Sequence, residues 1–443
     1  MAGGQWTVQN KVRPGVYINF KAQHKALNSV GERGTVAFPV SLPWGATEQV
    51  IELDHRTFLE DAQKLLGFRA TDERIRHIAA ATSHASTVLL YRLGGTDAKK
   101  ATATIGELTA TAKWGGERGN DLRIVVQQDI DEQDVLQVVT LLGMDEVDRQ
   151  LVKTVEQLVD NAFVDWTGTG ELTVTAGISL SGGTGGTQVG ADFAAALASF
   201  ENYNFNVLGI PQTDVSSKQI ATAYMKRLRD EEGKKVIAVV SNYPDADYEG
   251  IVSLHNGIET SDGLQVPASV LVWEVAGMQA AASITESLTY TAIPNGVAAY
   301  PRLNQAETIA ALKAGELVLT SLNGRAVIEQ DINTLTSFSA DRSKPFGKNR
   351  VVRTLDTIAN DIKELFDRYY IGKVANDKDG RALLFTEISS YMQKLDDLGA
   401  IQNFAYQTDV QVDAGENSDA VVVQLYVQPV DSVEKIYMNV EVV

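Results

Sequence analysis

The sequence predicts a multidomain protein of mixed α/β and α+β architecture. The chain has 443 residues, and a typical size of about 100–200 residues per domain predicts about three compact units. Residues 192–335 alternate helical patterns with short apolar runs, as a layered α/β domain does. Residues 98–181 are rich in threonine and in alternating apolar side chains, which predicts mainly β structure.

The first element is a strand in an amino-terminal linker arm that spans residues 1–22. Apolar side chains alternate there with glycine, asparagine and lysine, which is the period of a half-buried strand. Residues 1–31 contain lysine and arginine but no aspartate or glutamate, so the arm is basic. The residues that we expect to make contacts from this arm are Val12, Val16, Tyr17, Ile18 and Phe20.

Residues 23–95 predict a small α/β region that packs with the carboxyl-terminal domain. Strands are expected at 36–42, 50–53 and 88–91, with a helix at 72–83. A β domain follows at residues 96–181, with one helix expected at 145–161. The glycine-rich residues 182–187 are typical of a flexible hinge. The α/β domain takes residues 182–342, and Asn323 followed by Gly324 predicts a hairpin turn within it.

Residues 343–403 predict a helical or α+β carboxyl-terminal domain with two amphipathic helices, at 355–369 and 383–398. Residues 404–443 then predict carboxyl-terminal strands and a second linker arm, with strands at 404–412, 421–427 and 436–443. This arm is acidic. In its last strand one face carries Ile436, Met438, Val440 and Val442.

The two terminal strands need a partner, because isolated strands are not stable and open edges promote aggregation. The partner can be another segment of the same molecule. It can also be a neighbouring copy, bound through main-chain hydrogen bonds and opposite charges. The residues alone leave both alternatives open, and the second would make the protein a link in a chain of subunits.

The composition excludes several classes of protein. The chain has no cysteine, which excludes disulfides, thiolate nucleophiles and Cys-ligated metals. Its formal net charge of −18 disfavours binding to nucleic acid. The opening residues contain no apolar signal segment, and no run approaches the roughly 18 apolar residues of a membrane-spanning helix. We therefore expect a soluble, non-exported protein that binds no nucleic acid and inserts into no membrane.

The motifs give no catalytic, cofactor-binding or metal site. The glycine-rich tract lacks the Gly-Lys-Ser/Thr ending of a phosphate loop, and the histidines show no metal-ligand spacing. Residues 182–342 contain one histidine, His255, and no G-x-S-x-G motif, so a Ser-His-Asp site has little support. The sequence thus predicts no catalytic residues, no cofactor and no metal. Two functions stay open as alternatives to the one that the resemblance below implies: an α/β hydrolase-like enzyme and a non-contractile filament subunit.

Four segments resemble contractile phage tail sheath proteins, and together with their order they extend the resemblance over essentially the whole chain. The segments are VRPGVYINF (12–20), LSGGTGGT (180–187), NGRAVIEQDINTL (323–335) and KNRVVRTLDTIANDI (348–362). The chain is most similar to the short sheaths of Gram-positive myophages, defective prophages and phage-tail-like bacteriocins.

The resemblance implies a subtilisin-like α/β domain without catalytic residues, a β-sandwich at 96–181, and terminal arms that add strands to the carboxyl-terminal domains of neighbouring subunits. It implies a structural subunit that polymerises helically around the inner tail tube and contracts to drive the tube through the target cell envelope. The implied partners are further copies in stacked rings, the inner tail tube protein, and the baseplate and tail terminator proteins.

The resemblance also implies a location and a tube-facing surface. Sheath subunits assemble in the host cytoplasm and belong to the virion or phage-tail-like particle when mature. In the family the carboxyl-terminal domain faces the tube, and we expect the second amphipathic helix to do so here. Its candidate tube-facing residues are Arg381, Lys394, Asp396 and Asp397.

Overall fold

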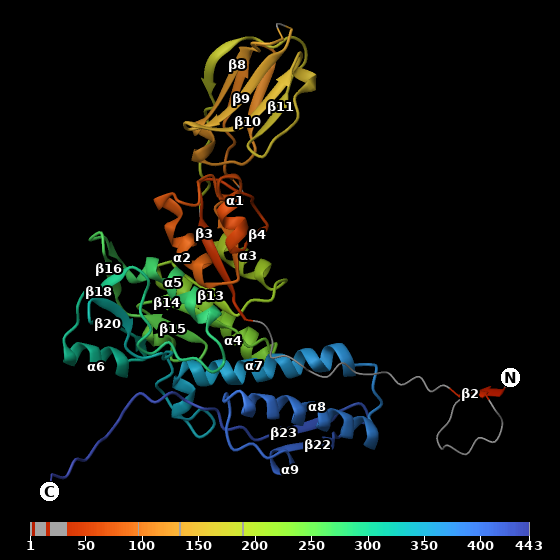
Figure 1. Cartoon of the computed structure of the whole chain (residues 1–443), viewed down its shortest axis with the longest axis vertical. Helices are drawn as coiled ribbons and strands as arrows, with labels where there is room; N and C mark the ends of the chain where they lie inside the picture. The colour runs from red at the N-terminus through yellow and green to blue at the C-terminus, as the bar shows by residue number, and fades with distance from the viewer. Residues whose placement is uncertain are drawn as a thin grey trace. The chain divides into compact units, whose positions relative to one another are not determined.

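The computed structural model describes residues 2–4, 15–17, 33–95, 97–132, 134–187 and 190–442 (Figure 1). The chain forms two compact units. The larger comprises residues 32–357 and 430–443, and the smaller comprises residues 1–31 and 358–429. Within the larger unit lie a central α/β domain and a β-sandwich.

The centre of the larger unit is a seven-stranded sheet. Its strand order is β19 (Glu316–Leu317), β15 (Ile251–Leu254), β14 (Ile237–Ser241), β13 (Val207–Gly209), β3 (Thr35–Ser41), β5 (Thr87–Leu93) and β4 (Val50–Leu53). Neighbouring strands are parallel except for β4, which runs antiparallel to β5 at one edge. The predicted α/β domain is confirmed.

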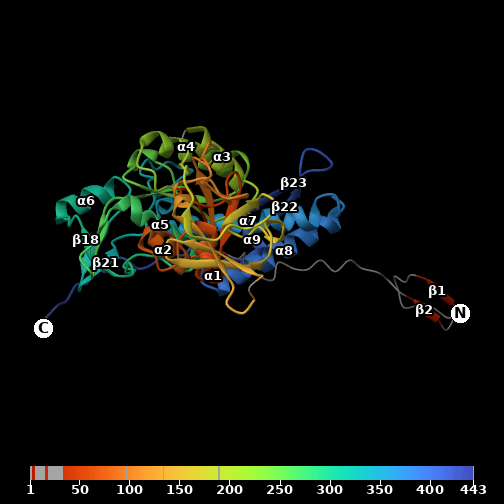
Figure 2. The ribbon, with the colours of Figure 1, turned by 90° about the horizontal axis from the view of Figure 1, so that it is seen from above.

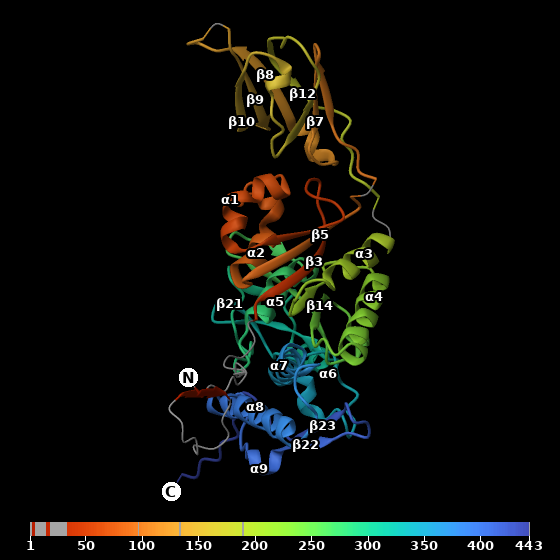
Figure 3. The same ribbon diagram turned by 90° about the vertical axis from the view of Figure 1, so that its right-hand side faces the viewer.

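Helices cover both faces of this sheet, as Figure 3 shows, and in Figure 2 α3 and α4 lie toward the opposite side of the larger unit from α1 and α2. On one face lie α1 (His55–Leu66), α2 (Arg76–His84) and α5 (Ala268–Ala281), and on the other lie α3 (Gly190–Phe200) and α4 (Val215–Lys226). The alternation of side chains along a strand creates the two cores: in β3, Val36 and Phe38 join the first core and Ala37 joins the second.

The region at 23–95, predicted as a small α/β region that packs with the carboxyl-terminal domain, is instead part of the central sheet where the structure describes it. Its strands β3, β4 and β5 belong to the central sheet, because β3 pairs with β13 and Val36 lies opposite Val207. The sequence reports only local periodicity, whereas this pairing joins segments about 170 residues apart, so the prediction was wrong.

Smaller elements complete the central domain. The strands β17 (Gln265–Val266), β16 (Gly257–Thr260) and β18 (Gly296–Tyr300) form an antiparallel sheet, and α6 (Gln305–Lys313) follows them. The hairpin predicted from Asn323 and Gly324 is confirmed: it joins β20 (Leu319–Leu322) to β21 (Arg325–Ile328), and both turn residues have positive φ, 50° and 75°.

The predicted β-sandwich is also confirmed. One sheet has the order β11 (Val164–Thr167), β7 (Leu108–Ala112), β6 (Thr102–Ile105), and the other β10 (Asp145–Val152), β9 (Leu136–Leu142), β8 (Leu122–Gln128), β12 (Thr175–Ser179). Their inward side chains form one continuous apolar core. The helix predicted at 145–161 is wrong: this segment is strand β10 and a short 3-10 turn at Val155–Gln157. Antiparallel pairing with the apolar strand β9 decides its conformation.

Helix α7 (Asn349–Leu365) begins in the larger unit and ends in the smaller one. The smaller unit continues with α8 (Lys378–Asp397), α9 (Tyr406–Asp409) and the hairpin of β22 (Val410–Ala414) and β23 (Val421–Leu425). Both amphipathic helices are confirmed, but the first part of the predicted strand at 404–412 is the helical turn α9.

The remaining elements are short. Single turns of 3-10 helix lie at η1 (Glu73–Ile75), η2 (Glu117–Asp121), η5 (Pro244–Ala246) and η6 (Lys344–Gly347), and π-helical turns lie at η4 (Arg227–Glu231) and η7 (Phe366–Tyr370). In the described part of the chain, none of the helices combines the length and the hydropathy that crossing a lipid bilayer requires.

Candidate functional site

The last described residues form an exposed segment with one apolar face. Residues 430–442 make no helix or strand, so the strand predicted at 436–443 has no ladder in the single chain over its described part, 436–442. Its alternating apolar side chains are nevertheless exposed: Ile436 by 79%, Met438 by 78%, Val440 by 70% and Val442 by 94%. Water-exposed apolar residues at strand spacing are typical of a segment that pairs with another chain.

This segment is fixed at its root. Glu434 is 11% exposed and forms an ion pair with Lys348. Thr289 Oγ1 donates a hydrogen bond of 3.0 Å to Glu434 Oε1, and Gln330 Nε2 donates one of 3.4 Å to Glu434 Oε2. The carboxylate is therefore held from three separate segments of the larger unit, and the apolar residues that follow it project from a fixed point.

The amino-terminal arm is described at two short strands. β1 (Ala2–Gly4) pairs in parallel with β2 (Gly15–Tyr17), so Ala2 lies opposite Gly15. Of the candidate contact residues, Val16 and Tyr17 lie in β2. Val12, Ile18 and Phe20 lie outside the described residues, as does Val443 at the other end.

Two buried polar clusters anchor the first half of α7 in the larger unit. Arg229 of η4 donates to both carboxylate oxygens of Asp356, at 2.5 and 2.8 Å. Burial alone would lower the pKa of Arg229, but the adjacent Asp356 carboxylate outweighs that effect and raises it. In the second cluster Arg353 Nη2 donates to Gln279 Oε1 at 2.7 Å, and Asn349 Nδ2 donates to Asp331 Oδ1 at 2.8 Å. We did not expect these groups from sequence, where they are isolated charges in amphipathic patterns.

The smaller unit has its own buried polar contact. Tyr391 of α8 is 1% exposed, and its hydroxyl donates a hydrogen bond of 2.6 Å to Asp361 Oδ2 of α7. Burial, together with the nearby carboxylate, raises the pKa of this tyrosine. The contact fixes the register of the two helices against each other.

The four candidate tube-facing residues lie at opposite ends of α8. Arg381 is in the first turn and donates to Asn376 Oδ1 at 3.0 Å. Lys394, Asp396 and Asp397 are in the last turn, where Asp397 accepts a hydrogen bond of 3.1 Å from Gln393. Arg381 and Lys394 are thirteen positions apart along the helix, which corresponds to about 20 Å. The helix does not bring the four side chains into one cluster.

The residues around His255 test the hydrolase alternative. His255 Nδ1 lies 2.6 Å from Glu316 Oε2, as in a base and its orienting carboxylate. The adjacent hydroxyl, however, has its hydrogen bonds with other groups: Ser253 Oγ accepts from the backbone N–H of Tyr243 at 2.7 Å and donates to Glu316 Oε1 at 3.5 Å. Ser253 and His255 therefore do not form a nucleophile and base pair.

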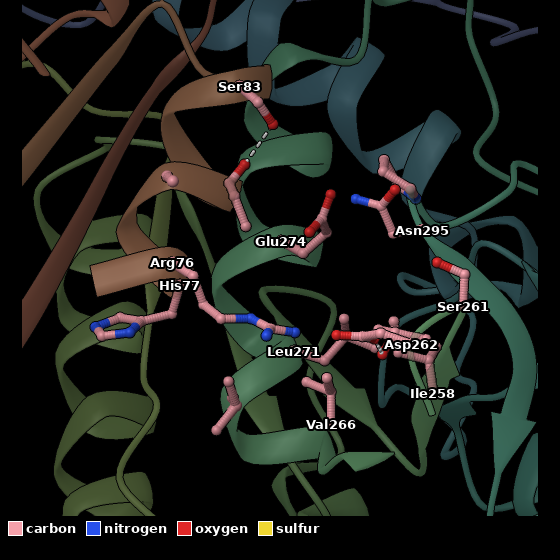
Figure 4. A pocket seen from close by; sticks show the side chains of 15 residues that line it. Arg76, His77, Ser83, Ile258, Ser261, Asp262, Val266, Leu271, Glu274 and Asn295 are labelled. Atoms are coloured by element: carbon pink, nitrogen blue, oxygen red, sulfur yellow. Dashed lines mark hydrogen bonds between the residues drawn. The ribbon is translucent and has the colours of Figure 1, made fainter. Parts of the chain in front are cut away.

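A surface pocket of about 530 Å³ between α2, α5 and β16 also lacks a catalytic arrangement (Figure 4). Ser83 donates to the carbonyl oxygen of Ala80 in its own helix at 2.7 Å. The ring of His77 points away from Asp262 in Figure 4 and contacts Trp273, with ring centroids 4.7 Å apart. Burial lowers the pKa of His77 to about 4. Over the described ranges, no group of histidine and carboxylate side chains has the geometry to hold a metal ion.

Comparisons with known proteins decide which family these features belong to. Family models of the phage tail sheath match the chain in order from residue 96 onward: the β-sandwich domain at residues 96–187, the central domain at 186–334 and the C-terminal domain at 341–443. The chain is 36% identical to the phage-like element PBSX protein XkdK of Bacillus subtilis, with 100% of both chains covered. The chain belongs to the phage tail sheath family.

Solved sheath structures agree. The sheath tail protein of Desulfitobacterium hafniense is 44% identical and superimposes with a TM-score of 0.87 over 96% of this chain and 99% of that one. The sheath tail protein of Listeria innocua is 36% identical, with a TM-score of 0.78 over 93% and 95%. The contracted helical sheath of the anti-feeding prophage, 12% identical with a TM-score of 0.59 over 97% and 99%, shares the fold.

Family membership settles several predictions. The resemblance to tail sheath proteins is confirmed, and so are the β-sandwich and the central α/β domain. The protein is a tail sheath subunit, hence a component of a phage tail or tail-like particle and a structural protein rather than an enzyme. His255, Glu316 and the pocket beside α2 are therefore structural features of the central domain.

Proposed function

We propose that this subunit polymerises helically around the inner tail tube and contracts to drive the tube through the target cell envelope. The observation that carries the proposal is the exposed apolar face of residues 436–442, which begins at a rigid anchor. A segment that stays exposed in one chain gains stability when neighbouring copies cover it, and head-to-tail contacts that do not close produce an open helix.

The arms link the subunits by strand addition. The hairpin of β22 and β23 has two strands, and in the described part of the chain neither outer edge is paired, so it can accept strands on both sides. The basic amino-terminal arm and the acidic carboxyl-terminal arm of two neighbours are electrostatically complementary. The residues that make these contacts are Val12, Val16, Tyr17, Ile18, Phe20, Ile436, Met438, Val440 and Val442.

In this proposal the domains of the subunit have the residue ranges expected from the sequence, except for residues 23–95. Residues 1–22 and 404–443 are the linker arm and the terminal strands, 96–181 the β-sandwich, 182–342 a subtilisin-like α/β domain without catalytic residues, and 343–403 the tube-facing domain. Residues 23–95 supply strands to the α/β domain's sheet. Helix α8 contacts the tube through Arg381, Lys394, Asp396 and Asp397, and exposed charge keeps that contact weak.

The role as a contractile sheath subunit also implies where the subunit assembles, which proteins it meets at the two ends of the sheath, and what supplies the energy. The subunit assembles in the host cytoplasm, and the baseplate and the tail terminator hold the two ends of the sheath. Contraction uses the free-energy difference between two packings of the same subunits, so no nucleotide is required. The arms stay paired throughout and act as tethers while the bodies between them rotate. Locking an arm to its neighbour by a disulfide should leave contraction intact, and a block would contradict the tether.

Assembly of arm variants tests the proposal. Ile436→Asp together with Val440→Asp places charge on the apolar face, and sedimentation velocity should show loss of polymer. The matched control, Asn439→Asp together with Tyr437→Asp, adds the same charge on the alternate side chains and should still form most of the polymer that the wild type forms. Equal behaviour of the two variants would show that strand pairing through the apolar face is wrong.

A further inference from the structure

A polar pocket lies at the root of the carboxyl-terminal segment. It has a volume of about 460 Å³ and is formed within the larger unit by the start of α7, the loop at 285–290, the two residues after β21 and residues 432–435. Arg350, Ser432 and Lys435 line it together with Glu329 and Tyr290. The pocket therefore adjoins the point from which the apolar arm projects.

Several donors in this pocket have no acceptor. Arg350 Nε is inaccessible to water and forms no hydrogen bond, and Ser432 Oγ is in the same state. Within the described ranges, neither the Arg350 guanidinium nor the Lys435 ammonium forms an ion pair. Buried donors are normally satisfied, so these unsatisfied atoms indicate that the pocket is incomplete in the single chain. The donors that an acceptor from outside can reach are those of the half-buried Arg350 guanidinium and the exposed Lys435 ammonium.

The carboxylates of the pocket do not supply that acceptor. Glu434 is engaged by Lys348, Thr289 and Gln330. Glu329 accepts a hydrogen bond of 2.7 Å from Thr320 Oγ1. Arg350 lies in the first turn of α7, where the helix dipole disfavours a cation. Its own helix therefore does not stabilise the guanidinium charge. In a chain with 57 acidic and 39 basic residues, such a free cationic site is matched best by a carboxylate.

We propose that this pocket receives a carboxylate from a second copy of the chain, and that the acidic turn between β22 and β23 supplies it. The inference rests on the proposed strand addition, because an arm paired with the neighbour's hairpin brings its own root to an end of that hairpin. The turn carries Glu416 and Asp419, and both side chains are exposed. Among the described residues, neither carboxylate has a hydrogen-bond partner. The pocket would then fix the register of the added strand, which main-chain hydrogen bonds alone leave undetermined.

Charge reversal in the full-length protein tests the pocket. Arg350→Glu should raise the concentration required for polymer formation by about tenfold or more, since close interfacial charge pairs have coupling energies of that order. Glu416→Arg with Asp419→Arg should have a similar effect, and combining all three changes should restore most of the assembly. Arg325→Glu, an exposed arginine of the same domain on β21, is the matched control and should leave assembly unchanged.

Cysteine cross-linking gives a second readout. Because the chain has no cysteine, Lys435→Cys with Asp419→Cys introduces the only two thiols. Oxidation of the assembled double variant should give a ladder of covalent multimers, whereas each single variant should give dimers at most. A ladder supports the proposal, and its absence in assembled polymer overturns it.

The outcomes separate this proposal from the function on which it rests. If the apolar-face variant fails to assemble but Arg350→Glu assembles normally, strand addition stands and the pocket proposal is wrong. If the apolar-face variant assembles normally, strand addition itself fails and the pocket loses its basis. If inorganic phosphate binds the wild-type protein and not Arg350→Gln, while the charge-reversed variants polymerise normally, the pocket binds small anions rather than a second copy.

Discussion

Replacing Arg229 by methionine tests whether its buried ion pair with Asp356 holds α7 to the central domain. The two side chains are 3% and 8% exposed and meet through two hydrogen bonds of 2.5 and 2.8 Å. Methionine fills much of the vacated space but leaves the Asp356 carboxylate buried without a counter-charge. Breaking a buried pair in this way costs about 3–5 kcal/mol. At about 2 °C per kcal/mol for a unit of this size, the melting temperature of the larger unit should fall by about 6–10 °C.

The matched control is the double variant Arg229→Met with Asp356→Leu. It removes both charges and with them the cost of burying an unpaired carboxylate, so it should recover most of the lost stability. Recovery is incomplete because Arg229 Nη1 also donates to the carbonyl oxygen of Val236 at 2.9 Å. Calorimetry at neutral pH measures both variants. A single variant that melts within about 2 °C of the wild type, or a double variant no more stable than the single one, would refute the reasoning.

Three further predictions concern other parts of the molecule. The pKa of His77 is lowered by burial to about 4, from about 6.5 when unfolded. The unfolded chain therefore takes up a proton first as pH falls from 6.5 to 4. The larger unit should lose about 2–3 kcal/mol over that window and be most stable above it; His77→Leu should flatten this part of the pH–melting profile. Tyr391→Phe removes the hydroxyl that donates to Asp361 and should destabilise the smaller unit by about 1.5–3 kcal/mol in urea unfolding followed by hydrogen exchange, with little effect on the larger unit. Glu434→Ala removes the anchor made with Lys348, so trypsin should cleave after Lys435 several-fold faster than in the wild type, and an unchanged rate would contradict the anchor.

The elements that sequence patterns predicted are those set by local spacing. The apolar positions of α8 recur every three or four residues, and Leu384, Ile388 and Leu395 are buried as that period requires. The hairpin at Asn323 follows from the positive φ that two adjacent residues must adopt. In both cases the information lies within a few residues.

The predictions that failed depend on distant partners. Strand β10 has an ambiguous pattern, and only its pairing with β9 makes it a strand. The membership of residues 33–93 in the central sheet depends on the pairing of β3 with β13. The anchors of α7 join Arg229 to Asp356 across 127 positions, a distance at which no spacing rule applies. The periodicity of residues 436–442 was visible in the sequence, whereas the anchor at Glu434 required the fold.

Electron microscopy of the purified full-length protein beside a variant that lacks residues 1–21 is the most direct test of the central claim that terminal arms link the subunits. The account predicts hollow, striated cylinders or stacked rings for the full-length protein, formed alone or on added tube protein. It predicts that the truncated variant keeps its fold but forms none of these assemblies. Cylinders of equal order from the truncated variant would contradict the claim, as would a full-length protein that stays monomeric even with the tube present.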